Sequence, residues 1–232
     1  MEIGIDVIGD LFLSPNDEFD WSGKSTSLYC IVTGNVGNDM GTLHKTLDNI
    51  AENYKGVFYI SGHYEFEDCD DIRKRTDEIN YVCQQIPNVA SLWHHVVILE
   101  SIAILGCNGF GQEEKYNNHI DQITATELRY EDLVYLKNSV SKLQKHGDVK
   151  SIISVTNSVP SPELYFGEVP EYAKSNAMLD LCIGADTENK ITHWAFGSYG
   201  KAVDISINGI TYISNPYNDI RTYWPKRIVA TI

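Results

Sequence analysis

The chain has 232 residues, 43% of them hydrophobic and 11% aromatic, so it can bury a substantial core, and we expect one domain over residues 1–232. Its formal net charge of −14 argues against binding to a nucleic-acid backbone, which needs Lys and Arg. No apolar run approaches the roughly 20 residues of a membrane span, and Met1-Glu2-Ile3 lacks the basic flank of a signal peptide.

In the first third of the sequence, apolar runs of strand length alternate with helical patterns. Strands are predicted over Ile3–Ile8, Leu28–Thr33 and Val57–Ile60. The second and third strands flank a predicted helix whose apolar stripe is Met40, Leu43, Leu47, Ile50 and Tyr54. Another helix is predicted over Asp70–Ile86, and the acidic residues from Glu65 to Asp71 are interpreted as its N-terminus, which favours negative charge. This alternation is typical of parallel βαβ units.

Later elements follow the same periodicities. Val96–Leu99 and Ser101–Gly106 predict a hairpin, and the polar segment from Asn108 to Asp121 predicts a loop or lid. The further predictions are a helix over about Thr126–His146, a strand at Ile152, a helix near Ala173–Cys182, and strands Ile191–Phe196, Ala202–Ile207 and Ile210–Ser214. Asn208-Gly209 joins the last two as a hairpin turn.

Polar or small residues follow five of the predicted strands. Asp10, Asn35, His63, Asn157 and Ser198 each stand where an apolar run ends. Open α/β sheets build their sites at the carboxyl ends of strands. We therefore expect these loops to converge on one site.

The motifs at these strand ends, taken in order, resemble those of the calcineurin-like metallophosphoesterase family over nearly the whole chain. The matching segments are Gly9-Asp10-Leu-Phe12, Thr33-Gly34-Asn35, Ser61-Gly62-His63-Tyr64-Glu65, Val155-Thr156-Asn157-Ser158-Val-Pro-Ser161 and Trp194-Ala-Phe196-Gly197-Ser198-Tyr199-Gly200. They stand where the family has Asp-x-His, Gly-Asp, Gly-Asn-His-Glu, Thr-His-His-x-Pro-Ser and Trp-x-His-Gly-His-x-His. The resemblance implies an α/β fold, a four-layer α/β/β/α sandwich of two mixed sheets flanked by helices.

The residues that bind metal in that family are mostly replaced here, so the chain resembles a degenerate member. Asp10 alone keeps the family's residue. The replaced positions are Phe12, Asn35, His63, Tyr64, Asn157, Ser198 and Gly200. The resemblance therefore predicts no catalytic residue among them and no Mn, Fe, Zn or Ni centre.

Charge alone leads to the same expectation. Two dications about 3.5–4 Å apart repel by roughly 19 kcal/mol at an effective dielectric constant near 20, and Asp10 is the single anionic side chain among the matched metal-binding positions. No cofactor is expected, and at most one weakly bound divalent metal. Its candidate ligands are Asp10, Asn35 and Asn157 for a hard cation such as Mg²⁺ or Ca²⁺, or His63 with Asp10 for a softer one.

Aromatic rings replace imidazoles at three positions, Phe12, Tyr64 and Phe196. The favoured interpretation is that they fill the vacated space, because voids in packed regions cost stability. An aromatic-lined ligand pocket remains the alternative.

Other features are interpreted structurally. Trp93-His94-His95 predicts a surface or edge position, and the five scattered cysteines predict reduced thiols in a cytoplasm-like compartment. The aromatic and basic segment 221–227 is expected to close the domain.

The preferred hypothesis is a catalytically inactive metallophosphoesterase-like protein that acts in binding or assembly with a protein partner. We expect a phage-encoded accessory protein, in the host cytoplasm or on the virion, without direct contact to nucleic-acid backbone or membrane. One alternative is a residual metal-dependent phosphoesterase or nuclease with an altered or single-metal site. Another is an acidic decoy for a DNA-binding protein.

Overall fold

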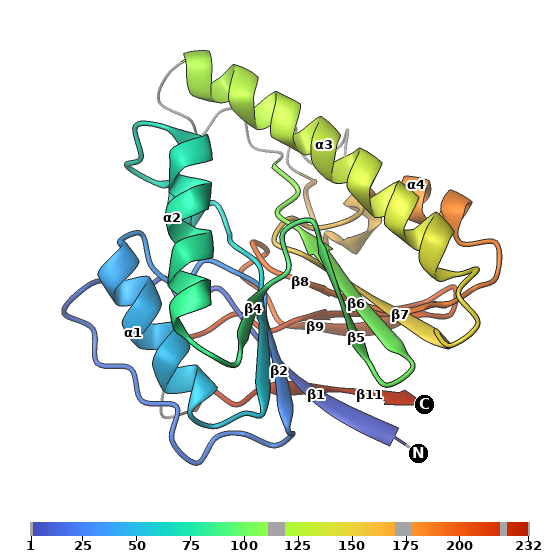
Figure 1. The fold of residues 1–232 in the computed structure, drawn as a ribbon, viewed down its shortest axis with the longest axis horizontal. Coiled ribbons are helices and arrows are strands. Elements are labelled where there is room, and N and C mark those ends of the chain that lie inside the picture. The colour runs from blue at the N-terminus through green and yellow to red at the C-terminus, as the bar shows by residue number, and fades with distance from the viewer. Residues whose placement is uncertain (1, 111–118, 170–177, 219–221, 232) are drawn as a thin grey trace.

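The structure, a computed structural model, describes residues 2–110, 119–169, 178–218 and 222–231. Two mixed β-sheets pack face to face, and helices cover both outer faces, so the predicted four-layer α/β/β/α fold is confirmed (Figure 1). The first sheet has the strand order β11-β1-β2-β3-β4 and the second has β5-β6-β7-β8-β10-β9.

The first sheet is parallel apart from one edge strand. Its strands are β1 (Glu2–Ile8), β2 (Tyr29–Val32), β3 (Gly56–Tyr59), β4 (Val89–Ser91) and β11 (Lys226–Thr231). β11 pairs antiparallel with β1, which places the first and last strands of the chain side by side. The helices α1 (Met40–Ala51) and α2 (Ile72–Gln85) cover the outer face of this sheet (Figure 1).

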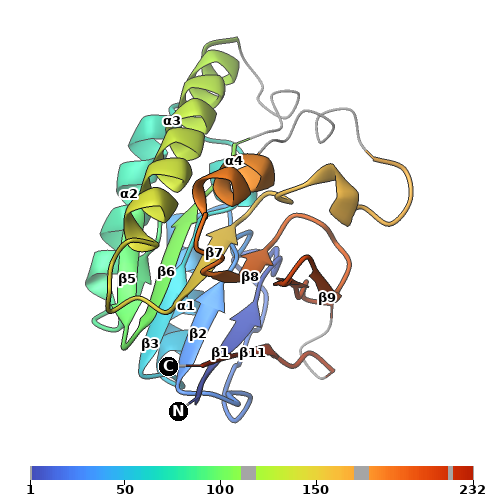
Figure 2. The same cartoon turned by 90° about the vertical axis from the view of Figure 1, so that its right-hand side faces the viewer.

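The second sheet is parallel at its centre and antiparallel at both edges. Its strands are β5 (His95–Leu99), β6 (Ile102–Cys107), β7 (Ser151–Thr156), β8 (Ile191–Phe196), β9 (Val203–Ile207) and β10 (Ile210–Ser214). β5 and β6 form the expected hairpin, as do β9 and β10. The arrowheads of β2, β7 and β8 point to the same end of the molecule (Figure 2), so the carboxyl ends of the two sheets lie together.

Three apolar clusters hold the layers together. One lies between the sheets and includes Ile5, Ile31, Ile104 and Val155, all buried. A second lies under α1 and α2 and contains Trp21, while a third on the far side of the second sheet contains Trp194. Both tryptophans are fully buried, and each marks a different outer cluster.

The long helix α3 (His119–Leu143) begins earlier than predicted, so the last three residues of the expected loop or lid are helical. Residues 111–118 of that segment lie outside the described residues. Leu128 of α3 packs in the cluster under α2, whereas Leu136 packs over the second sheet. α3 therefore joins the two outer layers.

α4 (Met178–Ala185) completes the helices, and the first residues of its predicted range, 173–177, lie outside the described part of the chain. The described helices include none that is long and apolar enough to cross a membrane.

His95 is exposed at the start of edge strand β5, as the sequence predicts, and the neighbouring His94 keeps 30% of its side chain exposed. His94 Nε2 lies 2.7 Å from Oδ1 of Asp132, an α3 residue with no exposed surface. Asp132 also accepts hydrogen bonds from the indole of Trp93 and the backbone amide of Gly109. A buried carboxylate needs such partners, and the sequence pattern gave no sign of them.

Candidate functional site

The loops after β1, β2, β3, β7 and β8 converge, as the sequence predicts. Their meeting point is crowded: a Cβ at Gly34 would lie 2.5 Å from Gly62 N, and one at Gly197 would lie 2.6 Å from Thr33 O. Only glycine lets the loops approach this closely, which explains why Gly34, Gly62 and Gly197 stand where they do.

A hydrogen-bond network joins the candidate residues across these loops. Asn35 Nδ2 donates to Asp10 Oδ1 (2.8 Å) and to Ser198 Oγ (3.0 Å). Ser198 donates through its backbone N to Asp10 Oδ1 (2.9 Å) and through Oγ to Asn157 Oδ1 (2.8 Å). The Nδ1 atom of His63 lies 3.0 Å from the same Ser198 Oγ. Asp10, Asn35, His63, Asn157 and Ser198 are therefore brought together.

Asn157 fixes the network to the sheet. Its Nδ2 donates to the backbone carbonyl of Thr33 (2.8 Å), and its Oδ1 accepts from the backbone N of His63 (3.3 Å). Asn35 is anchored in the same way, because its Oδ1 accepts from the backbone N of Tyr64 (3.1 Å). Both amide side chains thus use donor and acceptor atoms at once.

Asp10 is the most buried charged group of the network, with 2% of its surface exposed. Burial raises the pKa of its carboxyl group, and hydrogen bonds from Ser198, Asn35 and the backbone amides of Gly200 and Tyr199 oppose this shift. Gly200 thus acts on Asp10 through its backbone. Within the described residues, Asp10 Oδ2 is buried and has no direct hydrogen-bond partner.

Four non-glycine residues of these loops have a positive φ angle: Asp10 (53°), Phe12 (49°), Asn35 (55°) and Ser198 (55°). Asp and Asn tolerate this left-handed conformation, whereas Phe and Ser do so at some energetic cost. Strained backbone of this kind persists where surrounding contacts determine it, and it gathers at functional sites. The strained positions coincide with the predicted site.

The aromatic replacements do not share one role. Phe196 has no exposed surface and packs in the cluster over the second sheet, so it fills space as expected. Phe12 is 45% exposed and forms an edge-on pair with Tyr64, with ring centroids 5.2 Å apart. Filling of a vacated interior is therefore wrong for Phe12, which lies with Tyr64 and His63 at the outer side of the network.

Glu65 is the site residue whose role the sequence reasoning missed. It is fully buried and accepts from the backbone amides of Asn35 (3.1 Å), Val36 (2.6 Å) and Gly62 (2.8 Å). Burial raises its pKa to about 7, although these amides act in the opposite direction. Glu65 thus holds two site loops together. The acidic residue that caps the N-terminus of α2 is instead Asp71, which accepts hydrogen bonds from Arg73 N and Lys74 N.

This set of side chains does not suit a pair of dications. The atoms that would face the metals already bond to one another, and Asn35 directs an N–H group at Asp10, where a bridging ligand needs a lone pair. Amide and hydroxyl groups are also poor ligands for transition metals. In the described part of the chain, no three His, Cys, Asp or Glu side chains lie close enough together to hold a metal ion.

The fold is an α/β sandwich of two mixed sheets flanked by helices, and solved structures with a similar fold include proteins described as a hydrolase and a nucleotidase. The phosphopantetheinyl hydrolase PptH of Mycobacterium tuberculosis superposes with a TM-score of 0.68 at 12% identity, over 97% of this chain and 95% of that one. A protein described as a 5′-nucleotidase from Staphylococcus aureus, solved in complex with alpha-ketoglutarate, gives 0.57 at 11% identity, over 99% of this chain and 51% of that one.

GAP50, the anchor in the inner membrane complex of Plasmodium, has a TM-score of 0.59 at 10% identity, over 93% of this chain and 71% of that one. No family model matches the sequence. Among curated proteins, an uncharacterized protein of Acanthamoeba polyphaga mimivirus is 23% identical over 124 residues, which are 51% of this chain and 41% of that protein.

Proposed function

We propose that the protein is a phosphoesterase-like pseudoenzyme that acts by binding another protein, in an assembly or accessory role. The observation that carries this proposal is the hydrogen-bond network at the carboxyl ends of the strands, in which Asp10, Asn35 and Ser198 satisfy one another. A two-metal centre needs free lone pairs and several negative charges at these positions.

The same network supports a structural use of the former site. Five loops from two sheets are held together by hydrogen bonds of their side chains to one another and to the backbone. A rigid loop cluster is a suitable base for a binding surface, because little entropy is lost on association. GAP50, which shares this fold, is described as an anchor.

A viral or phage origin is consistent with the similarity to a mimivirus protein, and it remains part of the proposal. The acidic surface favours a basic protein partner over nucleic acid. The acidic-decoy hypothesis belongs to the same class and predicts binding that weakens steeply with salt.

The test is metal analysis of protein purified without chelator, followed by hydrolysis of bis-p-nitrophenyl phosphate with added Mn²⁺ or Ni²⁺. We expect far less than one metal ion per chain and no turnover above that of the isosteric Asp10→Asn variant. Stoichiometric metal, with turnover that Asp10→Asn abolishes, would overturn the proposal.

A second candidate is a phosphoesterase with a single hard cation, favoured by the buried Oδ2 of Asp10, which has no direct hydrogen-bond partner among the described residues. Asp10, Asn35 and Asn157 would hold the ion. Titration with Mg²⁺ or Ca²⁺ tests it: a rise in melting temperature in the wild type, lost in Asp10→Asn, supports this candidate over an empty site.

A further inference from the structure

A groove between α1 and α2 lies outside the converging loops. It has a volume of about 600 Å³, and the described residues that line it include Met40, Gly41 and His44 of α1 and Tyr81 and Val82 of α2. Gly41 has no side chain to fill it, and Tyr81 is 63% exposed at its wall. An open, largely apolar trough between two helices has the shape that amphipathic segments occupy in helix-in-groove complexes.

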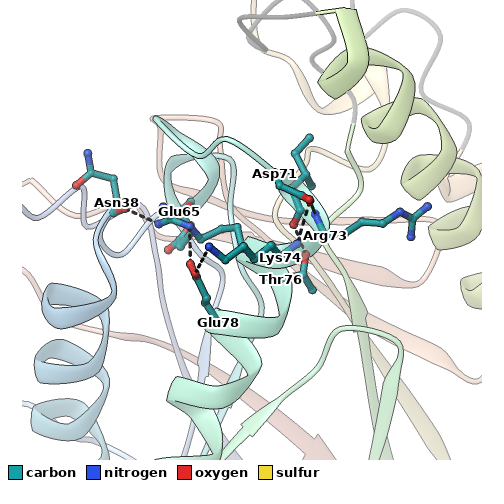
Figure 3. Close-up of polar contacts among 9 residues, drawn as sticks. Asn38, Glu65, Asp71, Arg73, Lys74, Thr76 and Glu78 are labelled. Atoms are coloured by element: carbon teal, nitrogen blue, oxygen red, sulfur yellow. Dashed lines mark hydrogen bonds and ion pairs between the residues drawn. The ribbon is translucent and has the colours of Figure 1, made fainter.

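The charges around the groove are mainly acidic. Glu78 lines it and is paired, with Arg75 Nε at 3.2 Å and Lys74 Nζ at 3.7 Å (Figure 3). Asp77 lines it as well, is exposed, and forms no ion pair within the described residues. Asp39 lies beside Gly41, and hydrogen bonds from Thr42 and Gly41 lower its pKa more than burial raises it. Among the described residues, Asp39 Oδ2 is buried and has no hydrogen-bond partner.

We propose that this groove binds an amphipathic segment of a partner protein, with apolar side chains inserted between the helices and a Lys or Arg facing Asp77. The inference rests on the proposed binding function and names its surface and the chemistry of its partner. A basic segment is favoured because Asp77 forms no ion pair within the described residues and the whole chain carries a charge of −14. An acidic segment would meet repulsion at the same rim.

The groove is also connected to the converging loops. Arg75, the partner of Glu78, donates through Nη1 to the backbone carbonyls of Asn38 (2.9 Å) and Glu65 (3.4 Å). Figure 3 shows Asn38 beside the start of α1 and Glu65 between it and α2, which carries Glu78. The Glu65 side chain accepts hydrogen bonds from two site loops, so Arg75 links the groove to those loops.

The experiment measures fluorescence anisotropy of a labelled, helical leucine–lysine peptide, with a leucine–glutamate peptide and a serine–lysine peptide of equal length beside it. We expect only the leucine–lysine peptide to bind tightly. Tyr81→Ala and Asp77→Lys should each weaken binding about tenfold, because aromatic and charged anchors dominate such interfaces.

Two matched controls exclude general effects. Tyr130→Ala removes an equally exposed tyrosine (69%) from α3, and Asp148→Lys makes the same charge change at an exposed site that does not line the groove. Both should bind like the wild type. Equal losses in the controls, or no binding by the wild type, would overturn the proposal. Circular dichroism of each variant confirms that it is folded.

Hydrogen exchange with the peptide bound separates this inference from the proposed function. Protection in α1 and α2 supports the groove. Protection elsewhere overturns the groove and leaves a binding function intact, whereas stoichiometric metal with turnover overturns the pseudoenzyme proposal and does not depend on the peptide.

Discussion

Replacing Asn35 with aspartate is the sharpest test of the network, because it restores a carboxylate without changing the size of the side chain. Asn35 Nδ2 lies 2.8 Å from Asp10 Oδ1 and 3.0 Å from Ser198 Oγ, and both hydrogen bonds would be lost. Each lost buried bond costs about 1–3 kcal/mol. Two carboxylates at this distance would also repel by about 6 kcal/mol at an effective dielectric constant of 20, so one of them takes up a proton instead.

The expected result at pH 7 is a loss of about 3–5 kcal/mol in the free energy of unfolding, measured by urea denaturation in EDTA. For a chain of this size the melting temperature should fall by about 10 °C. The two neighbouring carboxyl groups have a raised pKa in the folded state, so the variant's free energy of unfolding decreases as pH rises above the unfolded-state pKa near 3.9. The loss of stability relative to the wild type is therefore smaller at pH 5 than at pH 7.

Asn138→Asp, the same change at an exposed position of α3, serves as the control and should shift stability by less than about 0.5 kcal/mol. If Asn35→Asp is as stable as the wild type in EDTA at pH 7, the hydrogen-bond network does not hold the loops together and the reasoning fails. Recovery of stability on adding Mn²⁺ to the variant alone would show that the missing carboxylate is what excludes metal from the wild type.

Three further outcomes are expected. Gly62→Ala should cost about 3 kcal/mol or more, seen as a lower urea midpoint, because a Cβ there overlaps Asn35 and Asn157; an unchanged midpoint would contradict the packing. The pKa of Glu65 is raised to about 7, so Glu65 contributes stability that is present below about pH 4.5 and lost as pH rises to 7. This pH-dependent loss, about 3 kcal/mol in the free energy of unfolding, should be absent in Glu65→Gln. Asp71→Ala should remove about 1 kcal/mol by uncapping α2, while the neighbouring Asp70→Ala changes little.

Much of the fold could be predicted from the sequence because its central strands are fully buried runs, such as β6 and β7, flanked by turns. Two edge strands escaped prediction for different reasons. β4 has only three residues, too few for any periodicity. β11 alternates buried and exposed positions, and its first two residues belong to the basic segment 221–227, which we interpret as closing the domain. Edge strands carry weaker patterns because one side has no neighbouring strand.

The convergence of the site loops could be predicted, but their chemistry could be predicted only in part. That Asn35 lacks the charge of a bridging carboxylate is visible in the residue itself, whereas its bonds to Asp10 and Ser198 depend on three separate loops. Glu65 was hidden by its acidic neighbours, which made a solvated helix start the simpler interpretation. Its burial is a property of the tertiary fold, and the signal in the sequence is that Glu65 matches the Glu of the Gly-Asn-His-Glu motif.

The two buried tryptophans give the molecule a built-in pair of optical probes. Trp21 stacks on Phe19 and donates to Tyr54 in the cluster under α1 and α2, whereas Trp194 donates to Thr156 in the cluster over the second sheet. Variants in which Trp21 or Trp194 is the single tryptophan, with Trp93 and Trp224 also replaced, would report each half of the sandwich separately. Coincident transitions would mean that both sheets melt as a single cooperative unit.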